Sequence, residues 1–179
     1  MNELKTTFDN TIRAKLQTSL GLKNPMAVPT IQKITVNIGA GDALQNPKYM
    51  DMYVQDLTNI TAQKPVIIKT TKDVSNFKLR AGNKIGVKVT LRGEKMWDFL
   101  EKFIRGVVPR IKDFRGYDIK SIDSQGNYSI GIREHNVFLE IDPNKIERIH
   151  GLQFTITTST RDKKMALELL KEVGIPFKK

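Results

Sequence analysis

The sequence predicts an α+β protein with a mostly antiparallel sheet and helices packed on one face of it. Three observations lead to this prediction. Helical and strand periods interleave along the 179 residues, the strands alternate apolar with polar residues, and no repeat or linker divides the chain. Alternation implies a sheet that is covered on one face and exposed on the other. The length fits a single domain over residues 1–179.

An apolar residue at every fourth position predicts an N-terminal helix within residues 1–22. The stripe consists of Leu4, Phe8, Ile12, Leu16 and Leu20. Gly21 and then Pro25 end this helix. Residues 31–38 alternate next, which predicts a half-buried strand. Its apolar face carries Ile34, Val36 and Ile38, and its polar face carries Lys33, Thr35 and Asn37.

The next elements are a helix, two strands and the loop that joins them. Apolar positions at helical spacing predict a helix over residues 48–61, and a short apolar run at 66–68 predicts a strand. Residues 86–92 alternate and predict another strand. Residues 71–85 show no sustained period, so we predict a long basic loop there, with a short strand around 77–79 as an option within it.

The second half of the chain continues in the same manner. A strongly apolar helix begins at Glu94 and ends at Pro109, which lacks the backbone N–H that a helix needs. Residues 109–127 then form a second long basic loop. The remaining predicted elements are strands over 128–132, 137–141 and 152–157, a helical turn over 144–147, and a final helix over 162–173.

The charge of the chain is large and unevenly placed. Lys and Arg number 30 against 19 Asp and Glu, which gives a net charge of +11. Residues 62–95 alone hold nine basic and two acidic residues, or +7. A polyanion is therefore the leading partner, with nucleic acid ahead of an anionic membrane. The N-terminus lacks the apolar core of a signal peptide and no apolar run approaches a membrane span, so we expect a cytoplasmic protein with no membrane contact.

Amide, hydroxyl and cationic side chains share the exposed face of the predicted sheet. Asn37 comes from the 31–38 strand, and Lys88, Thr90 and Arg92 come from the 86–92 strand. Amides and hydroxyls read base edges and 2′-hydroxyls, whereas Lys and Arg bind phosphate. This face is therefore a candidate RNA-binding surface. A merely solvated sheet face would carry a similar pattern, and that alternative stays open.

The two long loops are further candidates. The 71–85 loop carries Lys72, Lys78, Arg80 and Lys84 around Phe77. Basic groups around an aromatic ring are typical of contacts with single-stranded or irregular RNA, in which the ring stacks on a base. Alternatively, Phe77 anchors the loop to the core. The second loop carries Arg110, Lys112 and Arg115, which are either a contact surface or a solvated stretch.

Several classes of chemistry are excluded. The chain has no cysteine, which excludes a disulfide scaffold, a thiolate metal site and a Cys nucleophile. Residues 38–44 begin like a dinucleotide-binding loop, but Leu44 stands where the third glycine belongs. His135 and His150 are expected to be surface or hydrogen-bonded histidines, and the carboxylates are dispersed. We therefore predict no enzyme, no cofactor and no metal.

Several blocks of the chain resemble, in order and spacing, the bacterial form of the large-subunit ribosomal protein five family. They are KITVNIGAG at 33–41, TAQKP at 61–65, FKLR at 77–80, IGVKVTLRGE at 85–94, MW at 96–97, VPRIKDFRG at 108–116, GNYSIGIRE at 126–134, GLQFTITT at 151–158 and GIPF at 174–177. The resemblance is nearly collinear from Pro29 to Phe177. Two departures are Asn83-Lys84, where the family usually has Pro at the second position, and Leu139 in place of Pro, which would regularise the 137–141 strand.

The resemblance implies a structural, non-catalytic role in the ribosome. The protein would act as a monomer in the large subunit, bind 5S rRNA and attach it to the large (23S-type) rRNA at the central protuberance. The implied 5S contacts are Asn37, Gln63, Thr90 and Arg92. The 71–85 loop would reach peptidyl-site tRNA, and residues 110–115 and 142–148 would contact rRNA or bridge to a small-subunit head protein. A free RNA- or DNA-binding architectural or regulatory protein is the alternative.

Overall fold

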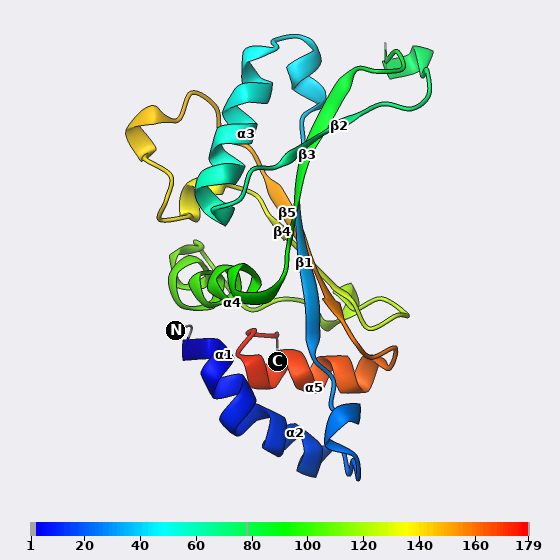
Figure 1. Cartoon of the computed structure of the whole chain (residues 1–179). Helices are drawn as coiled ribbons and strands as arrows, with labels where there is room; N and C mark the ends of the chain where they lie inside the picture. The colour runs from blue at the N-terminus through cyan, green and yellow to red at the C-terminus, as the bar shows by residue number, and fades with distance from the viewer. Residues whose placement is uncertain (1–2, 78, 179) are drawn as a thin grey trace. The chain divides into compact units, whose positions relative to one another are not determined.

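The computed structural model describes residues 3–77 and 79–178, with the backbone alone for Lys145. Its architecture is α+β, as predicted (Figure 1). Five strands form one sheet in the order β2-β3-β1-β5-β4. The strands are β1 Ile31–Gly39, β2 Val66–Lys69, β3 Lys84–Leu91, β4 Tyr128–Ile132 and β5 Leu152–Thr158. The α-helices are α1 Glu3–Thr7, α2 Arg13–Ser19, α3 Lys48–Thr61, α4 Gly93–Lys102 and α5 Lys163–Val173.

Backbone hydrogen bonds give the strand directions. β2 pairs antiparallel with β3, with Val66 opposite Lys88 and a register shift between Ile68 and Lys69. The Ala40 N–H donates to the Ile85 carbonyl over 2.9 Å, so the end of β1 meets the start of β3. Antiparallel pairing is what the alternation predicts for a sheet that is covered on one face.

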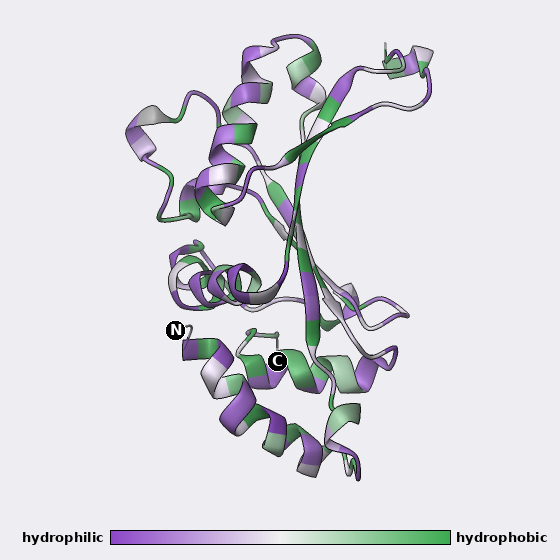
Figure 2. Cartoon of the chain, viewed as in Figure 1, coloured by the Kyte–Doolittle hydropathy of each residue, from purple (hydrophilic) through white to green (hydrophobic). Residues whose placement is uncertain are grey.

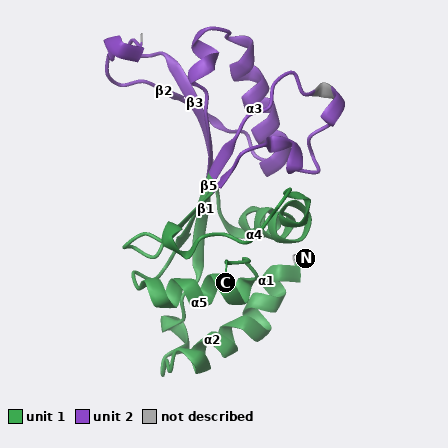
Figure 3. Cartoon of the chain, turned by 180° about the vertical axis from the view of Figure 1, so that it is seen from behind, with its two compact units in different colours: residues 1–34, 91–130, 154–179 green, residues 35–90, 131–153 purple. Residues whose placement is uncertain are grey.

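The chain divides into two compact units, each built from separate stretches of sequence (Figure 3). Unit 1 comprises residues 1–34, 91–130 and 154–179, and unit 2 comprises residues 35–90 and 131–153. The single domain over 1–179 stays a prediction.

Unit 1 is held by aromatic packing among its helices and β5. A π-helical turn, Phe8–Ile12, joins α1 to α2, so the predicted N-terminal helix forms over residues 3–19. Phe8, Ile12 and Leu16 of its apolar stripe are buried, and the two end residues are half-buried. The Phe8 ring lies 5.0 Å from that of Trp97 on α4. Phe99 and Phe103 meet Phe154 of β5 edge-on, at centroid distances of 5.3 and 4.7 Å. Edge-to-face pairs of this kind add stability beyond the apolar area they bury.

Unit 2 is organised by α3, which lies against one face of its strands (Figure 1). The buried residues recur at helical spacing on α3 and at alternate positions on β1 and β3. They are Met50, Tyr53, Leu57 and Ile60 on the helix, with Val36, Ile38, Val87 and Val89 on the strands. The predicted helix over 48–61 is therefore confirmed, and it leaves the opposite sheet face uncovered by α3.

The predicted strand over 137–141 is wrong. His135–Val137 forms a 3-10 turn, and the Phe138 N–H donates to the His135 carbonyl over 3.1 Å. Phe138 and Ile141 are buried, whereas Leu139 is 66% exposed, so burial repeats every three residues rather than every two. Local i→i−3 hydrogen bonds replace a strand ladder here. Leu139 therefore does not regularise a strand.

The other predicted elements form close to their expected bounds. α4 continues into a π-helical turn, Phe103–Val107, and the expected turn near 144–147 forms as a 3-10 turn over Pro143–Lys145. The Asp162 carboxylate caps α5 by accepting the Lys164 N–H over 2.8 Å, and Gly174 ends it with φ 104°. Among the described residues, no helix combines the length and the apolar content that crossing a membrane requires.

Candidate nucleic-acid interface

The exposed face of β1 and β3 carries the polar side chains that the alternation placed there. Hydrophilic and hydrophobic residues alternate along these strands (Figure 2). Asn37 and Thr90 are half-buried and Lys88 is exposed, whereas Val87 and Val89 point to the core. Because β1 and β3 are neighbours in the sheet, an amide, an ammonium and a hydroxyl share one surface of unit 2. Such a surface offers both phosphate-binding and edge-reading groups.

Gln63 joins this surface through the turn that ends α3. Ala62 adopts the left-handed conformation, with φ 50°, and reverses the chain direction. The Thr61 hydroxyl, buried at the helix end, lies 2.6 Å from the Leu57 carbonyl and 3.2 Å from that of Gln63. The Gln63 Nε2 then donates to the Thr90 carbonyl over 3.3 Å. The carboxamide of Gln63 is therefore held beside Thr90 at the edge of the polar face.

Arg92 follows β3 directly but belongs to unit 1. Its backbone is extended, with φ −140° and ψ 162°, and it precedes the first residue of α4. Arg92 is exposed and its neighbour Leu91 is fully buried, so the alternation of β3 continues through it. Its part in RNA binding stays a prediction.

The described residues of the predicted 71–85 loop extend the β2–β3 hairpin through hydrogen bonds, and the last two, Lys84 and Ile85, already belong to β3. The Thr70 N–H donates to the Asn83 carbonyl over 2.8 Å, and the Thr70 hydroxyl donates to the Arg80 carbonyl over 2.5 Å. Further along, Val74 and Leu79 exchange two backbone hydrogen bonds of 3.0 and 3.1 Å. Ser75–Phe77 is a 3-10 turn, so the optional strand around 77–79 reduces to this single bridge.

The tip of this loop presents a ring and cations to solvent. Phe77 is 73% exposed, so the alternative in which it anchors the loop to the core is wrong. Lys72 and Arg80 are exposed, Lys84 is exposed at the start of β3 opposite Lys69, and Lys78 lies outside the described residues. The hairpin therefore holds an exposed ring among basic groups, the combination that stacks on an unpaired base.

The predicted contact residues of the 109–127 loop lie in unit 1. Arg110, Lys112 and Arg115 are all exposed. Tyr117 anchors the segment that follows them, because its N–H donates to the Pro176 carbonyl over 2.8 Å and its carbonyl accepts from the Lys178 N–H over 2.9 Å. Burial raises the pKa of the Tyr117 phenol to about 12, so this side chain stays neutral.

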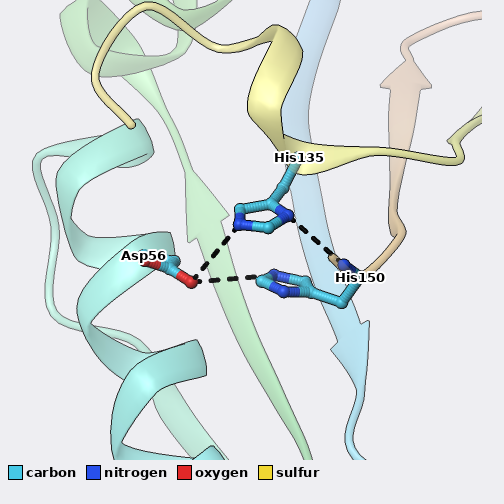
Figure 4. Close-up of side chains that lie close together, drawn as sticks. All are labelled: Asp56, His135 and His150. Carbon is cyan, nitrogen blue, oxygen red and sulfur yellow. Dashed lines mark hydrogen bonds and ion pairs between the residues drawn. The ribbon is translucent and has the colours of Figure 1, made fainter. Parts of the chain in front are cut away.

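Sequence reasoning missed a cluster in unit 2 that consists of the half-buried Asp56 and the buried His135 and His150 (Figure 4). Asp56 Oδ2 lies 3.9 Å from the Nε2 atoms of both histidines. The prediction of surface or hydrogen-bonded histidines holds for His135, which is buried and whose Nδ1 accepts a hydrogen bond. His150 is buried too, and its ring nitrogens form no close hydrogen bond with the residues that the structure describes. No local pattern links these residues, because the fold alone brings them together.

The geometry of this cluster does not suit a metal ion. One potential ligand atom from each residue lies within 4.8 Å of the others. However, the imidazole rings stack face to face, with centroids 3.8 Å apart and planes 17° apart. A metal lies in the plane of each imidazole that binds it, and two stacked planes do not meet at one atom. In addition, His135 Nδ1 accepts the His150 N–H over 3.3 Å, which leaves the ring proton on Nε2, where a ligand lone pair would be needed.

The fold is α+β, and its exposed polar and basic side chains are typical of a nucleic-acid-binding protein. Comparison with known proteins is more specific. The family model for ribosomal protein L5 matches residues 24–80, and a second model, which describes the C-terminus of the same ribosomal protein family, matches residues 84–177. The chain belongs to the ribosomal protein L5 family.

Full-length relatives agree with this assignment. The large ribosomal subunit protein uL5 of Carboxydothermus hydrogenoformans is 47% identical over 177 residues, which cover 99% of both chains. The protein of the same name from Colwellia psychrerythraea is 48% identical over 179 residues, covering 100% of this chain and 99% of its own. That of Francisella tularensis is 49% identical over 178 residues, or 99% of each.

Proposed function

We propose that the chain is a structural constituent of the large ribosomal subunit that binds 5S rRNA through the polar face of unit 2. Membership in the ribosomal protein L5 family supports a structural, non-enzymatic role in the bacterial cytoplasm, with rRNA as the partner. The observation that carries the 5S assignment is the placement of Asn37, Lys88 and Thr90 on one uncovered face, with Gln63 hydrogen-bonded to its edge.

The chemistry of this face fits folded RNA. The carboxamides of Asn37 and Gln63 and the Thr90 hydroxyl donate and accept hydrogen bonds, so they recognise base edges and 2′-hydroxyls. Lys88, and Arg92 in unit 1, are exposed cations that bind phosphate and set affinity. In this proposal the neutral groups give specificity and the cations give strength.

Two other surfaces, the hairpin tip and the basic residues of unit 1, bind the remaining proposed partners. The exposed hairpin tip around Phe77 contacts peptidyl-site tRNA. Lys72, Arg80 and Lys84 bind the phosphates of this tRNA, and the sequence assigns the same role to Lys78. In unit 1, Arg110, Lys112 and Arg115 contact rRNA or bridge to a small-subunit head protein. Within the large ribosomal subunit the protein acts as a monomer, and it attaches 5S rRNA to the large rRNA at the central protuberance.

A binding experiment with a matched control tests the proposal. The full chain is titrated against 5S rRNA and against an unrelated DNA duplex over a range of salt concentrations. We expect tighter binding to 5S rRNA at every salt concentration, weakened by Asn37→Ala but not by Asn59→Ala, an exposed asparagine on α3. Equal affinity for both nucleic acids would overturn the 5S assignment and favour a free RNA- or DNA-binding protein.

A second measurement addresses the assembly. The chain is purified with its native partners under mild conditions, and the bound RNA is identified. Co-purification of 5S rRNA and large subunits is expected, and recovery of the chain without either would overturn the ribosomal assignment.

A further inference from the structure

The stacked histidines of unit 2, which we call the histidine pair, join the two ends of one chain segment. His135 and His150 stand at the two ends of residues 135–150, and the His135 N–H donates to the His150 carbonyl over 3.0 Å. The His150 N–H donates in return to His135 Nδ1 over 3.3 Å, and the rings stack at 3.8 Å (Figure 4). Only 1% of His135 and 9% of His150 are exposed.

This closure depends on neutral imidazoles. His135 Nδ1 accepts the backbone N–H only while it carries no proton, because a protonated imidazole has two donors and no acceptor. A second charge on the stack would lie against the first within a buried site, which costs free energy. Neither ring nitrogen of His150 makes a close hydrogen bond with a described residue, and the Arg148 backbone only partly offsets the effect of burial on the His150 pKa.

The polar and charged side chains around the histidine pair come from α3, from the turn Gly41–Leu44 and from the segment itself. From α3, Asp56 Oδ2 lies 3.9 Å from each Nε2, too far for a hydrogen bond, and the Tyr53 ring meets His150 edge-on at 4.6 Å. From the turn Gly41–Leu44, Asp42 accepts the Tyr53 hydroxyl over 2.7 Å and pairs with the Arg148 cation at 3.1 Å. Asp42 favours a cation on His150 and the Arg148 side chain opposes it, and these charges do not offset burial, which keeps the pKa of His150 low.

We propose that the histidine pair is a proton-sensitive latch: proton uptake releases residues 135–150 from α3 while the rest of unit 2 stays folded. Release is local because the segment contains only short 3-10 turns, over His135–Val137 and Pro143–Lys145, and no strand of the sheet. The proposal concerns the free chain and does not rest on the proposed RNA binding.

The direction of the pH dependence follows from the pKa values. Burial, and then the nearby His135, lower the pKa of His150 to about 4, and burial lowers that of His135. In the released segment both return to about 6.5, so the open form takes up protons first as the pH falls below that value. His150 alone then raises the opening constant about thirtyfold between pH 7.5 and pH 5. Burial raises the pKa of Asp56, so proton uptake by Asp56 in the closed form acts in the opposite sense to proton uptake by the histidines.

Amide hydrogen exchange on the full chain tests the latch. Protection factors are measured at pH 7.5 and pH 5.0 in the presence of EDTA and corrected for intrinsic exchange. We expect the protection of amides in 135–150 to fall about thirtyfold or more at pH 5.0, while amides of α5, which contains no histidine, serve as the internal reference. Equal changes in both sets of amides would overturn the proposal.

A variant separates the latch from general acid sensitivity. His150→Phe keeps an aromatic ring in the stack but takes up no proton at this position, so the pH dependence of the segment's protection falls to the part that His135 contributes. If this variant does not fold, His150→Gln replaces it, and NMR titration of the wild-type histidine ring protons gives a direct reading. A pH dependence in the folded variant as large as that of the wild type, or a folded-state His150 pKa near 6.5, would contradict the latch.

Discussion

Replacement of Gln63 by alanine separates the folding role of this residue from its proposed role in RNA binding. Within the part of the chain that the structure describes, the half-buried Gln63 side chain makes one hydrogen bond, from Nε2 to the Thr90 carbonyl over 3.3 Å. The backbone turn around it depends on Thr61 and Ala62, which the substitution leaves unchanged. The loss to folding is therefore limited to one long neutral hydrogen bond.

The two expected magnitudes differ in their consequences. A neutral hydrogen bond contributes about 0.5–1.5 kcal/mol, and a donor–acceptor distance of 3.3 Å places this one near the lower end. Such a loss leaves a domain with a stability of about 5–15 kcal/mol almost entirely folded. Loss of a carboxamide contact to RNA costs a similar free energy in binding, which raises the Kd for 5S rRNA about two- to tenfold.

Urea unfolding and filter binding measure the two effects on the same samples. Gln55→Ala is the matched control, because Gln55 is exposed on α3 and belongs to the same unit. We expect a small loss of unfolding free energy and a clear rise in Kd for Gln63→Ala, and no rise in Kd for the control. Binding of Gln63→Ala to 5S rRNA with wild-type affinity would refute the assignment of Gln63 to the RNA face.

Three further predictions address other parts of the chain. Arg92→Ala should weaken 5S rRNA binding by about 1–3 kcal/mol and reduce its salt dependence, whereas Lys72→Ala on the loop should leave that affinity within about twofold. Binding is measured over a range of salt concentrations, and a larger loss for Lys72→Ala than for Arg92→Ala would contradict the proposed division of roles. Gly126→Ala should lower the unfolding free energy by about 2–4 kcal/mol in urea titrations, because φ is 74° and the added Cβ would meet a backbone carbonyl oxygen, and wild-type stability would contradict this. Ala62→Gly should raise the melting temperature by a stabilisation of up to about 1 kcal/mol, since glycine accepts the left-handed φ of 50°, and a destabilised variant would argue against that conformation.

Much of the candidate RNA face was predictable because strand alternation is a local property. Val87 and Val89 are buried, and because successive side chains of a strand point to opposite faces, Lys88 and Thr90 lie on the outer face. The same reasoning failed at 137–141, where apolar residues alternate but Phe138 and Ile141 enter the core from successive turns. Alternation over five residues does not reveal whether a neighbouring strand is available to pair with them.

The sequence by itself determined the α+β class, the N-terminal helix, the family resemblance and the concentration of positive charge in residues 62–95, because each depends on residue type and short spacing. Only the tertiary structure decided the ordered hairpin with Phe77 at its exposed tip, the hydrogen bond between Gln63 and Thr90, and the histidine pair beside Asp56. Those features arise where the backbone brings residues from distant parts of the chain together, and no local period records such a meeting.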